Sequence, residues 1–213
     1  MMVHYLQENI FLLFNEERPG GTNALIGPPS ISYEYTAAIL FDIADPKNKH
    51  ATTCIANPGS GQVTYHNDKE VSLCIINYEA FVDLFTIAKI DKKGRSRVDF
   101  IVHDTSDQKA CFILNELSEG SVQNKLSKAR LQLQNTLLDL MKDADVKSYI
   151  SSFQQKQCIL SCRTEPEPVS PLDMAIGFAT AKQIIPPNSK FSAKSIERLG
   201  FDCIENDHVL IKN

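Results

Sequence analysis

The sequence predicts an α/β fold with a mixed central β-sheet flanked by helices. Short apolar runs of strand length, such as 71–76 and 110–117, alternate with longer segments whose apolar residues recur about every 3.6 residues. Alternation of this kind is typical of a sheet covered by helices. The apolar fraction of 43% and the charged fraction of 23% fit a globular chain and exclude a disordered or fibrous one.

The chain of 213 residues has the length of one large domain or two small ones, and no repeat or low-complexity stretch divides it. We therefore expect a single α/β domain over 1–213. Residues 71–163 would form its core. Residues 1–65 would be either a β-rich N-terminal extension or the beginning of the sheet.

Composition and sequence pattern limit both the cellular location and the binding partners expected for the protein. No apolar run approaches the roughly 18 residues of a membrane span, and the first residues lack the basic segment and cleavage site of a secretion signal. The six cysteines are scattered without a C-x-x-C pair, so we expect buried free thiols and a reducing, cytoplasmic environment. The net charge of -4 argues against nucleic-acid binding by the whole surface and leaves only local basic patches.

The first half of the chain begins with a predicted helix over 5–14, which Pro19, Gly20 and Gly21 end. Strands are expected over 31–43 and 51–55, on either side of a polar loop. The apolar run 71–76 predicts another strand, and the helix expected after it, over 78–88, has Asn77 as its N-cap.

In the second half, the runs 98–102 and 110–117 predict a β-hairpin. An apolar stripe predicts the longest helix over 124–144. The remaining expected elements are a strand over 157–162, a helix that opens at Ser170-Pro171 and ends before Pro186, a short helix over 193–199, and a terminal hairpin of 201–204 with 209–211.

Two carboxylates stand out on the predicted central hairpin. Because strand side chains alternate, Glu116 shares one face with Leu114 and Ser118. If the turn is centred between residues 107 and 108, Asp99 lies opposite Glu116 on that face, with their Cβ atoms about 5 Å apart. A strand that is apolar on both faces is central in its sheet, so Glu116 would sit where the strand leaves the core.

Like charges this close raise each other's pKa unless a cation or donor lies between them. The pair therefore predicts either a shared proton or a divalent-metal site, for which Mg²⁺ is the natural occupant because it keeps several waters, one of which can attack a phosphodiester. The structural alternative is that Asp99 only begins its strand and pairs with Arg97 or Lys93, while Glu116 ends in solvent.

Basic residues precede and follow the carboxylate pair. Each group taken singly is typical of a solvated turn or helix face, but their placement on both sides of the pair favours a local nucleic-acid-binding patch. The residues concerned are Lys92, Lys93, Arg95 and Arg97 before Asp99, and Lys125, Lys128 and Arg130 after Glu116.

The segment Arg97-Val-Asp99-Phe-Ile-Val, a turn, the segment Phe112-Ile-Leu-Asn-Glu116-Leu-Ser118 and a long helix together resemble the core of the PD-(D/E)XK nuclease superfamily, over residues 71–162. The resemblance implies that Asp99 and Glu116 hold the metal. It also implies a further acid on the preceding helix, which Glu79 matches, and a polar residue on the following helix, which Gln132 matches.

The chain departs from this motif where the superfamily's lysine, two residues beyond the second acid, is Ser118. That lysine positions and activates the attacking water, so catalysis would need Lys125 or Lys128 to reach back from the helix. The resemblance then implies a DNA endonuclease dependent on Mg²⁺ or Mn²⁺, acting in restriction, repair or defence against foreign DNA, with DNA or another subunit as partner and a dimer as one option.

Two alternatives stay open. One is a catalytically inactive nuclease fold that serves as a protein-interaction or nucleic-acid-binding module, and the other is an unrelated α/β domain. Other chemistries find less support: there is no G-x-S-x-G or P-loop sequence, and the five histidines show no paired metal-ligand spacing. His103, on the Asp99 face of its strand, either serves the site or is an ordinary surface residue.

Overall fold

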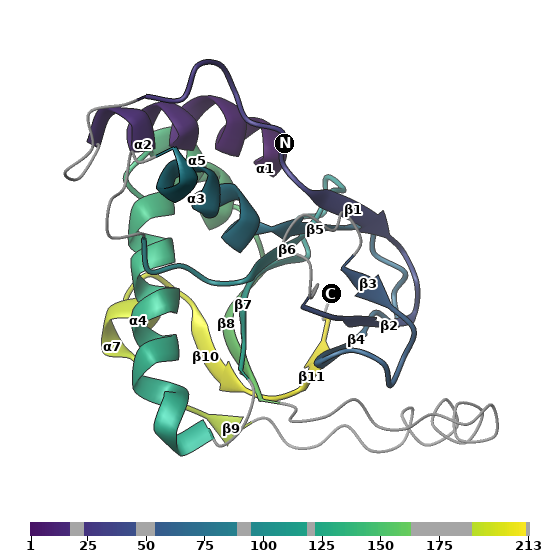
Figure 1. Ribbon diagram of the computed structural model, residues 1–213. Coiled ribbons are helices and arrows are strands. Elements are labelled where there is room, and N and C mark those ends of the chain that lie inside the picture. The colour runs from purple at the N-terminus through teal and green to yellow at the C-terminus, as the bar shows by residue number, and fades with distance from the viewer. Residues whose placement is uncertain (18–23, 46–53, 89–94, 119–121, 163–188, 212–213) are drawn as a thin grey trace.

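The computed structural model describes residues 1–17, 24–45, 54–88, 95–118, 122–162 and 189–211, which form two β-sheets with helices against the larger one (Figure 1). The mixed α/β class predicted from the sequence is confirmed. The helix expected from Ser170 lies outside the described residues.

The larger sheet has the strand order β1-β5-β6-β7-β8-β10-β9. Strands β1, β5, β6 and β7 pair antiparallel in turn, whereas β8 pairs parallel with β7, β10 pairs parallel with β8, and β9 runs antiparallel to β10, so the sheet is mixed. The strands are β1 Tyr33–Thr36, β5 Leu73–Asn77, β6 Phe100–Asp104, β7 Cys111–Leu117, β8 Gln155–Ser161, β9 Ser189–Lys190 and β10 Asp202–Glu205.

The smaller sheet has the order β11-β4-β2-β3 and packs on one face of the larger sheet. Phe41 and Tyr65 from the smaller sheet and Phe100 and Ile113 from the larger one share a single apolar cluster, which explains how the two sheets adhere. The strands are β2 Leu40–Ile43, β3 Ile55–Ala56, β4 Val63–His66 and β11 His208–Leu210.

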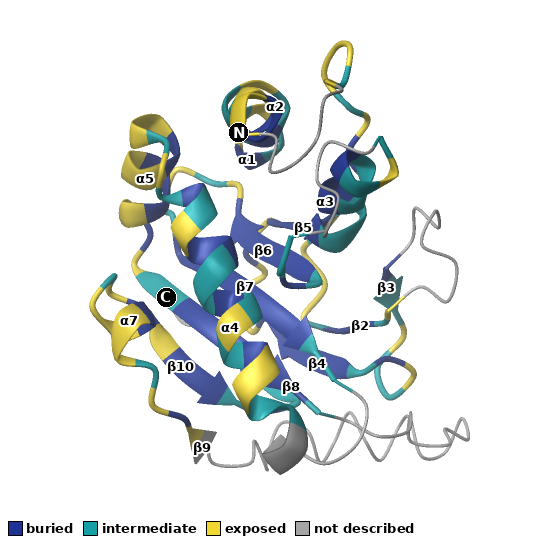
Figure 2. Cartoon of the chain, turned by 60° about the vertical axis from the view of Figure 1, so that its left-hand side comes forward, coloured by how far each residue is buried: buried dark blue, intermediate teal, exposed yellow. Residues whose placement is uncertain are grey.

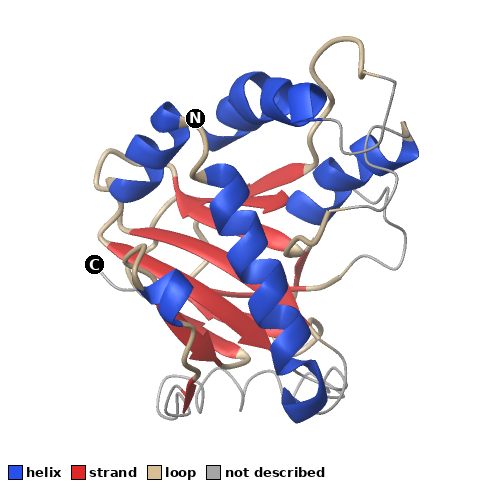
Figure 3. Cartoon of the chain, turned by 90° about the vertical axis from the view of Figure 1, so that its left-hand side faces the viewer, coloured by secondary structure: helices blue, strands red, loops and turns tan. Residues whose placement is uncertain are grey.

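Helices cover the other face of the larger sheet, with α4 running across its strands (Figure 3). The buried side of α4 faces the strands and its exposed side faces outward (Figure 2), as expected for an amphipathic surface helix. The N-terminal helix is continuous and contains a π-helical turn, η1. The helices are α1 Met2–Tyr5, η1 Leu6–Ile10, α2 Phe11–Glu17, α3 Tyr78–Ile87, α4 Val122–Leu140, α5 Ala144–Ser151 and α7 Lys194–Glu197.

The segment from β5 to β7 agrees with the sequence prediction. Asn77 caps α3 by accepting a hydrogen bond from the Ala80 backbone N–H at 2.9 Å, as predicted. The side chains of β7 are fully or almost fully buried as far as Glu116, because helices cover one face of this strand and the smaller sheet covers the other.

The predicted helix over 124–144 is wrong at its C-terminal end. The chain forms α4 to Leu140 and then a separate helix, α5. The break occurs at Asp143, which has an extended backbone and accepts hydrogen bonds from the N–H groups of Asp145 and Val146 at 3.0 and 2.9 Å. A side-chain cap of this kind begins a new helix and therefore ends the old one.

The predicted terminal hairpin is also wrong, because β10 and β11 belong to different sheets. The connecting residues are bonded to both: Ser161 Oγ donates to the Asn206 carbonyl at 2.9 Å in the larger sheet, and the Thr64 N–H donates to the Asp207 carbonyl at 2.8 Å in the smaller one. Each strand then pairs in parallel with a neighbour from elsewhere in the chain.

The N-terminal strands differ from prediction in the same way. Residues 31–43 form two strands, of which β1 pairs with β5 in the larger sheet and β2 pairs with β4 in the smaller one. The sequence reading missed β4, and most of the strand predicted over 51–55 lies outside the described residues. Residues 1–65 thus contribute to both sheets.

The state of the cysteines agrees with the prediction of buried free thiols. Five of the six cysteines are buried and free, and Cys162 is partly buried and free. Along the part of the chain that the structure describes, no helix is long and apolar enough to cross a membrane.

His103 lies at the far end of β6 from Asp99, inside an aromatic cluster. Its ring is 1% exposed and packs edge-on against Tyr149 and Phe153, with ring centroids 6.1 and 6.2 Å away. Its Nδ1 lies 2.9 Å from the Asp104 carbonyl, and Nε2 has no hydrogen-bond partner among the described residues. Burial lowers the pKa of His103 to about 4.

We expect this histidine to make the fold sensitive to acid. A folded-state pKa below the unfolded value means that stability is present above pH ~6.5 and is lost as pH falls toward 4, so about 2 kcal/mol disappears between pH 7 and 5. His103→Phe keeps an aromatic ring and should remove most of this loss. Urea unfolding of wild type and variant at both pH values measures it, with exposed His4→Gln as control; equal acid sensitivity in His103→Phe and wild type contradicts the assignment.

Candidate functional site

The juxtaposition of the two acids follows from the β6–β7 register. The antiparallel ladder ends with the pair Phe100–Asn115, so Asp99, the residue before β6, lies at the end of the ladder beside Glu116, the residue after Asn115. The Asp99 carboxylate accepts a hydrogen bond from the Leu117 N–H at 2.6 Å, which holds it against the end of β7.

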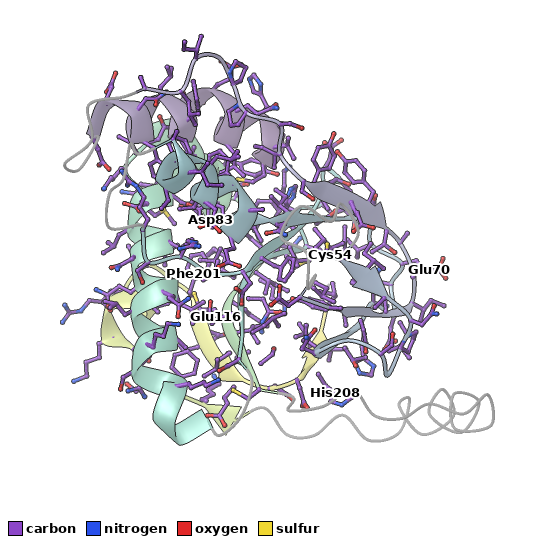
Figure 4. The ribbon with its side chains drawn as sticks, in the orientation of Figure 1. Cys54, Glu70, Asp83, Glu116, Phe201 and His208 are labelled. Atoms are coloured by element: carbon purple, nitrogen blue, oxygen red, sulfur yellow. The ribbon has the colours of Figure 1, made fainter. Side chains whose placement is uncertain are left out.

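Glu116 is buried rather than solvated. Its side chain lies beside α4 (Figure 4), the residue is 6% exposed, and Oε2 has no hydrogen-bond partner among the described residues. The structural alternative in which Glu116 ends in solvent is therefore wrong. Burial and the nearby charge of Asp99 raise the pKa of Glu116 to about 9, against the opposing influence of Lys128.

Asp99 is partly exposed and shares this environment. Burial raises its pKa to about 7, although the hydrogen bond from Leu117 favours the charged form, and the charge of Glu79 adds to the increase. Near neutral pH, two acids with such pKa values hold fewer than two negative charges between them. The site therefore favours species that bring positive charge: a proton or a metal cation.

Arg97 does not supply this positive charge to the acid pair at short range. Its Nη2 donates to Glu79 Oε1 at 3.0 Å and to Asp83 Oδ1, both on α3. Arg97 lowers the pKa of Asp99 only as a nearby charge. Glu79, the further acid implied by the resemblance, is thus in an ion pair, yet its charge still raises the pKa of both site acids.

The other arginines in the predicted basic patch also have partners within the fold. Arg95 binds Glu17 at 2.8 Å and Asp139 at 3.5 Å, and its guanidinium lies 3.8 Å above the ring of Phe14, so it joins the N-terminal helix to α4. Arg130 lies 5.6 Å above the ring of Phe191. These contacts favour structural roles, and DNA contact by Arg95, Arg97 or Arg130 stays a prediction. Lys92 and Lys93 lie outside the described residues.

A pocket of about 230 Å³ lies between the end of β7 and α4. It is lined by Glu116, Leu117, Ser118, Lys125, Lys128, Ala129 and Gln132. The two lysines come from successive turns of α4, and they line the same hollow as the serine that replaces the motif lysine. Either lysine therefore lies where it could supply the positive charge that Ser118 lacks at the position of the motif lysine.

Gln132 contributes a second buried oxygen that accepts no hydrogen bond from the described residues, in addition to Glu116 Oε2. Its Nε2 donates to the Arg97 carbonyl at 2.7 Å, which fixes the amide orientation because a flipped amide would place two acceptors together. Its Oε1 is then buried without a hydrogen-bond partner among the described residues, like Glu116 Oε2. Two such oxygens fit a hard cation, which binds oxygen ligands.

The ligand set would be small. Among the described residues, no group of three histidine, cysteine, aspartate or glutamate side chains is arranged to hold a metal. A cation here would be held by Asp99 and Glu116, with the Gln132 amide and water completing its shell, which suits Mg²⁺ because it retains several waters.

Two neighbours of the pair escaped the sequence analysis. Asp45, just beyond β2, contributes to the raised pKa of Asp99, although it is distant in sequence and lies in a polar loop without a motif. Cys162 follows β8; burial raises its pKa to about 11, and the charges of Lys125 and Glu116 also act on it. His103 is excluded from the site, because it is four residues further along β6, about 13 Å away.

Comparisons with protein-family models, with curated protein sequences and with solved structures found no match.

We expect Glu116→Gln to stabilise the protein at neutral and alkaline pH. The folded-state pKa of Glu116 is raised, so its carboxyl contributes most below the unfolded pKa near 4.5, and this contribution is lost as pH rises toward 9. A glutamine amide has no charge to desolvate and can donate to Asp99. At pH 8 the free energy of unfolding should rise by at least about 1.4 kcal/mol, the equivalent of one pKa unit.

Urea unfolding at pH 4.5 and pH 8, in a metal-free buffer, measures this effect. The gain should shrink at pH 4.5, where the glutamate is protonated in the folded state and only about half ionised in the unfolded state. Exposed Glu16→Gln should show no such gain. Lower stability of Glu116→Gln at pH 8 would mean that the carboxylate is favourably bound.

Proposed function

We propose that the protein is a divalent-metal-dependent nuclease whose metal is held by Asp99 and Glu116. The observation that carries the proposal is the buried Glu116 carboxyl, which has an oxygen without a hydrogen-bond partner among the described residues and lies beside a second acid, Asp99, at the end of the β6–β7 ladder. The resemblance to the PD-(D/E)XK superfamily rests on the same two residues.

The electrostatics support a cation at this position. Two carboxylates in a buried site repel each other, and removing either from water costs free energy unless an opposite charge compensates it. A bound Mg²⁺ or Mn²⁺ would supply that charge, lower the pKa of a bound water and polarise a phosphoryl oxygen. Asp99 would stay oriented through its hydrogen bond from Leu117.

The lysines of α4 complement the acids. Lys125 and Lys128 line the pocket beside Glu116, where they would attract the phosphate group and stabilise charge that develops on it. Ser118 would contribute a hydroxyl donor but no charge. Because the chain has a net charge of -4, DNA would bind through this local patch rather than through the whole surface.

A second candidate is a catalytically inactive module on the same fold, which binds nucleic acid or protein. Two observations favour it: Ser118 stands at the motif-lysine position, and the Glu79 carboxylate is engaged by Arg97. Both candidates keep the acid pair, so only an assay of cleavage separates them.

We expect the wild-type protein to cleave DNA in the presence of Mg²⁺ or Mn²⁺ and to be inert in EDTA. Asp99→Asn and Glu116→Gln should each reduce the rate at least about 100-fold, because loss of either acid empties the metal site. Lys128→Gln should reduce it about tenfold or more through lost charge stabilisation. Gel assays on supercoiled plasmid, linear duplex and single-stranded DNA measure these rates.

Exposed Glu16→Gln is the matched control and should cleave at the wild-type rate. Titration of Mn²⁺ by calorimetry gives an independent reading, with binding expected in wild type and lost in Glu116→Gln. If wild type and Asp99→Asn are equally inert on all three substrates, the nuclease proposal is wrong and the module remains.

A further inference from the structure

The segment that carries Asp99 lies outside the strand ladder. Strand β6 begins at Phe100, and its pairing with both β5 and β7 also ends at this residue. The position of Asp99 therefore depends on contacts other than the ladder. Its backbone carbonyl accepts hydrogen bonds from the first two N–H groups of α3, at 2.9 Å from Tyr78 and 3.2 Å from Glu79.

The peptide unit between Arg97 and Val98 is bound by α4 at both of its polar groups. The Gln132 Nε2 donates to the Arg97 carbonyl at 2.7 Å, and the Thr136 hydroxyl oxygen accepts from the Val98 N–H at 3.0 Å. This peptide bond is trans, so its C=O and N–H groups point in opposite directions. Contacts at both groups fix the orientation of the peptide plane one residue before Asp99.

The helix period places both contacts on one face of α4. Gln132 and Thr136 are four residues apart and therefore lie on successive turns of the helix, toward this segment. Val98 is 0% exposed and Thr136 is 1% exposed, so water cannot replace the hydroxyl as acceptor. A buried N–H without an acceptor costs free energy, which the chain can lower by moving the peptide.

From these contacts we infer that Thr136 is a positioning residue for Asp99: its hydroxyl, together with the Gln132 amide, holds the peptide before Asp99 and so directs the Asp99 carboxylate toward the metal position. This inference rests on the proposed nuclease function. The Leu117 N–H holds the carboxylate from β7 at 2.6 Å, and Thr136 holds the preceding backbone from α4. Groups that orient a metal ligand typically change metal affinity about 10- to 100-fold when they are removed.

The first test needs neither metal nor cleavage. Because the Leu117 N–H binds the Asp99 carboxylate, its amide proton in an assigned ¹H–¹⁵N NMR spectrum, recorded in EDTA, reports on the position of that carboxylate. Thr136→Val keeps the shape of the side chain and removes its acceptor. We expect the Leu117 amide proton to move upfield as its hydrogen bond to Asp99 lengthens. Thr136→Ser keeps the hydroxyl and should retain the wild-type position.

The control is Ile150→Val, which removes one methylene group from the apolar core between the helices and the larger sheet, but on α5. It should lower stability in urea without moving the Leu117 amide proton. Gln132→Met removes the other contact with the peptide and decides the question if Thr136→Val does not fold. A Leu117 amide proton that stays at the wild-type position in the folded variant, Thr136→Val or its replacement, overturns the inference.

The second test measures metal binding and separates this inference from the nuclease proposal. Calorimetric titration should show Mn²⁺ binding about tenfold or more weaker in Thr136→Val than in wild type, and unchanged in Thr136→Ser and Ile150→Val. Cleavage by Thr136→Val should fall at limiting Mn²⁺ and recover at saturating Mn²⁺, because the variant displaces a metal ligand and keeps the other groups of the site.

The outcomes of the two tests differ for the two proposals. Equal Mn²⁺ affinity of Thr136→Val and wild type overturns the positioning role and leaves the nuclease intact. If wild type neither binds Mn²⁺ nor cleaves DNA, the nuclease proposal is wrong. A Leu117 amide proton that moves in Thr136→Val and not in Thr136→Ser would still support the hold of Thr136 on Asp99.

Discussion

The register of the β6–β7 hairpin is the constraint on which the site depends. A slip of one residue would turn Glu116 to the opposite face from Asp99, because strand side chains alternate. Asp104 holds the register: it is fully buried at the end of β6, and its carboxylate accepts hydrogen bonds from the Ser106 N–H and hydroxyl and from the Ala110 N–H, at 2.7 to 2.8 Å. One end of the hairpin is fixed by this acid, and the other carries the candidate site.

The same arrangement explains why the acid pair is costly. β7 is sandwiched between the helices and the smaller sheet, so its side chains leave water almost completely, and Glu116 does so with only partial compensation. The Leu117 N–H stabilises Asp99, and Lys128 opposes the rise in the pKa of Glu116, yet both pKa values remain raised. Local instability of this kind is typical of functional sites, where it prepares a group for a ligand or proton.

Much of this segment could be predicted because its pattern is local. The alternation of side chains predicts β7, and the Asn77 cap predicts where β5 ends and α3 begins. The centre of the turn between β6 and β7 then predicts that Asp99 meets Glu116. Pairing between distant segments could not be predicted: the short runs that form β10 and β11 carry no signal for which sheet they join. In the sequence, Arg95 and Arg97 cannot be distinguished from basic residues that face solvent. The fold shows that Arg95 binds Glu17 and that Arg97 binds Glu79.

The packing of α4 determines where the positive charge of the candidate site lies. A lysine on β7 would be held by the same ladder as the acids, whereas Lys125 and Lys128 depend on how α4 packs. Ala129, Leu133 and Leu137 on the inner side of α4 are buried in the apolar core between the helices and the larger sheet, and this burial fixes the position of α4. Arg95 and the Gln132 amide add polar ties from the segment before Asp99 to α4. The helix that carries the lysines is therefore bonded to the segment just before Asp99, which keeps the acidic and basic halves of the site together without a shared strand.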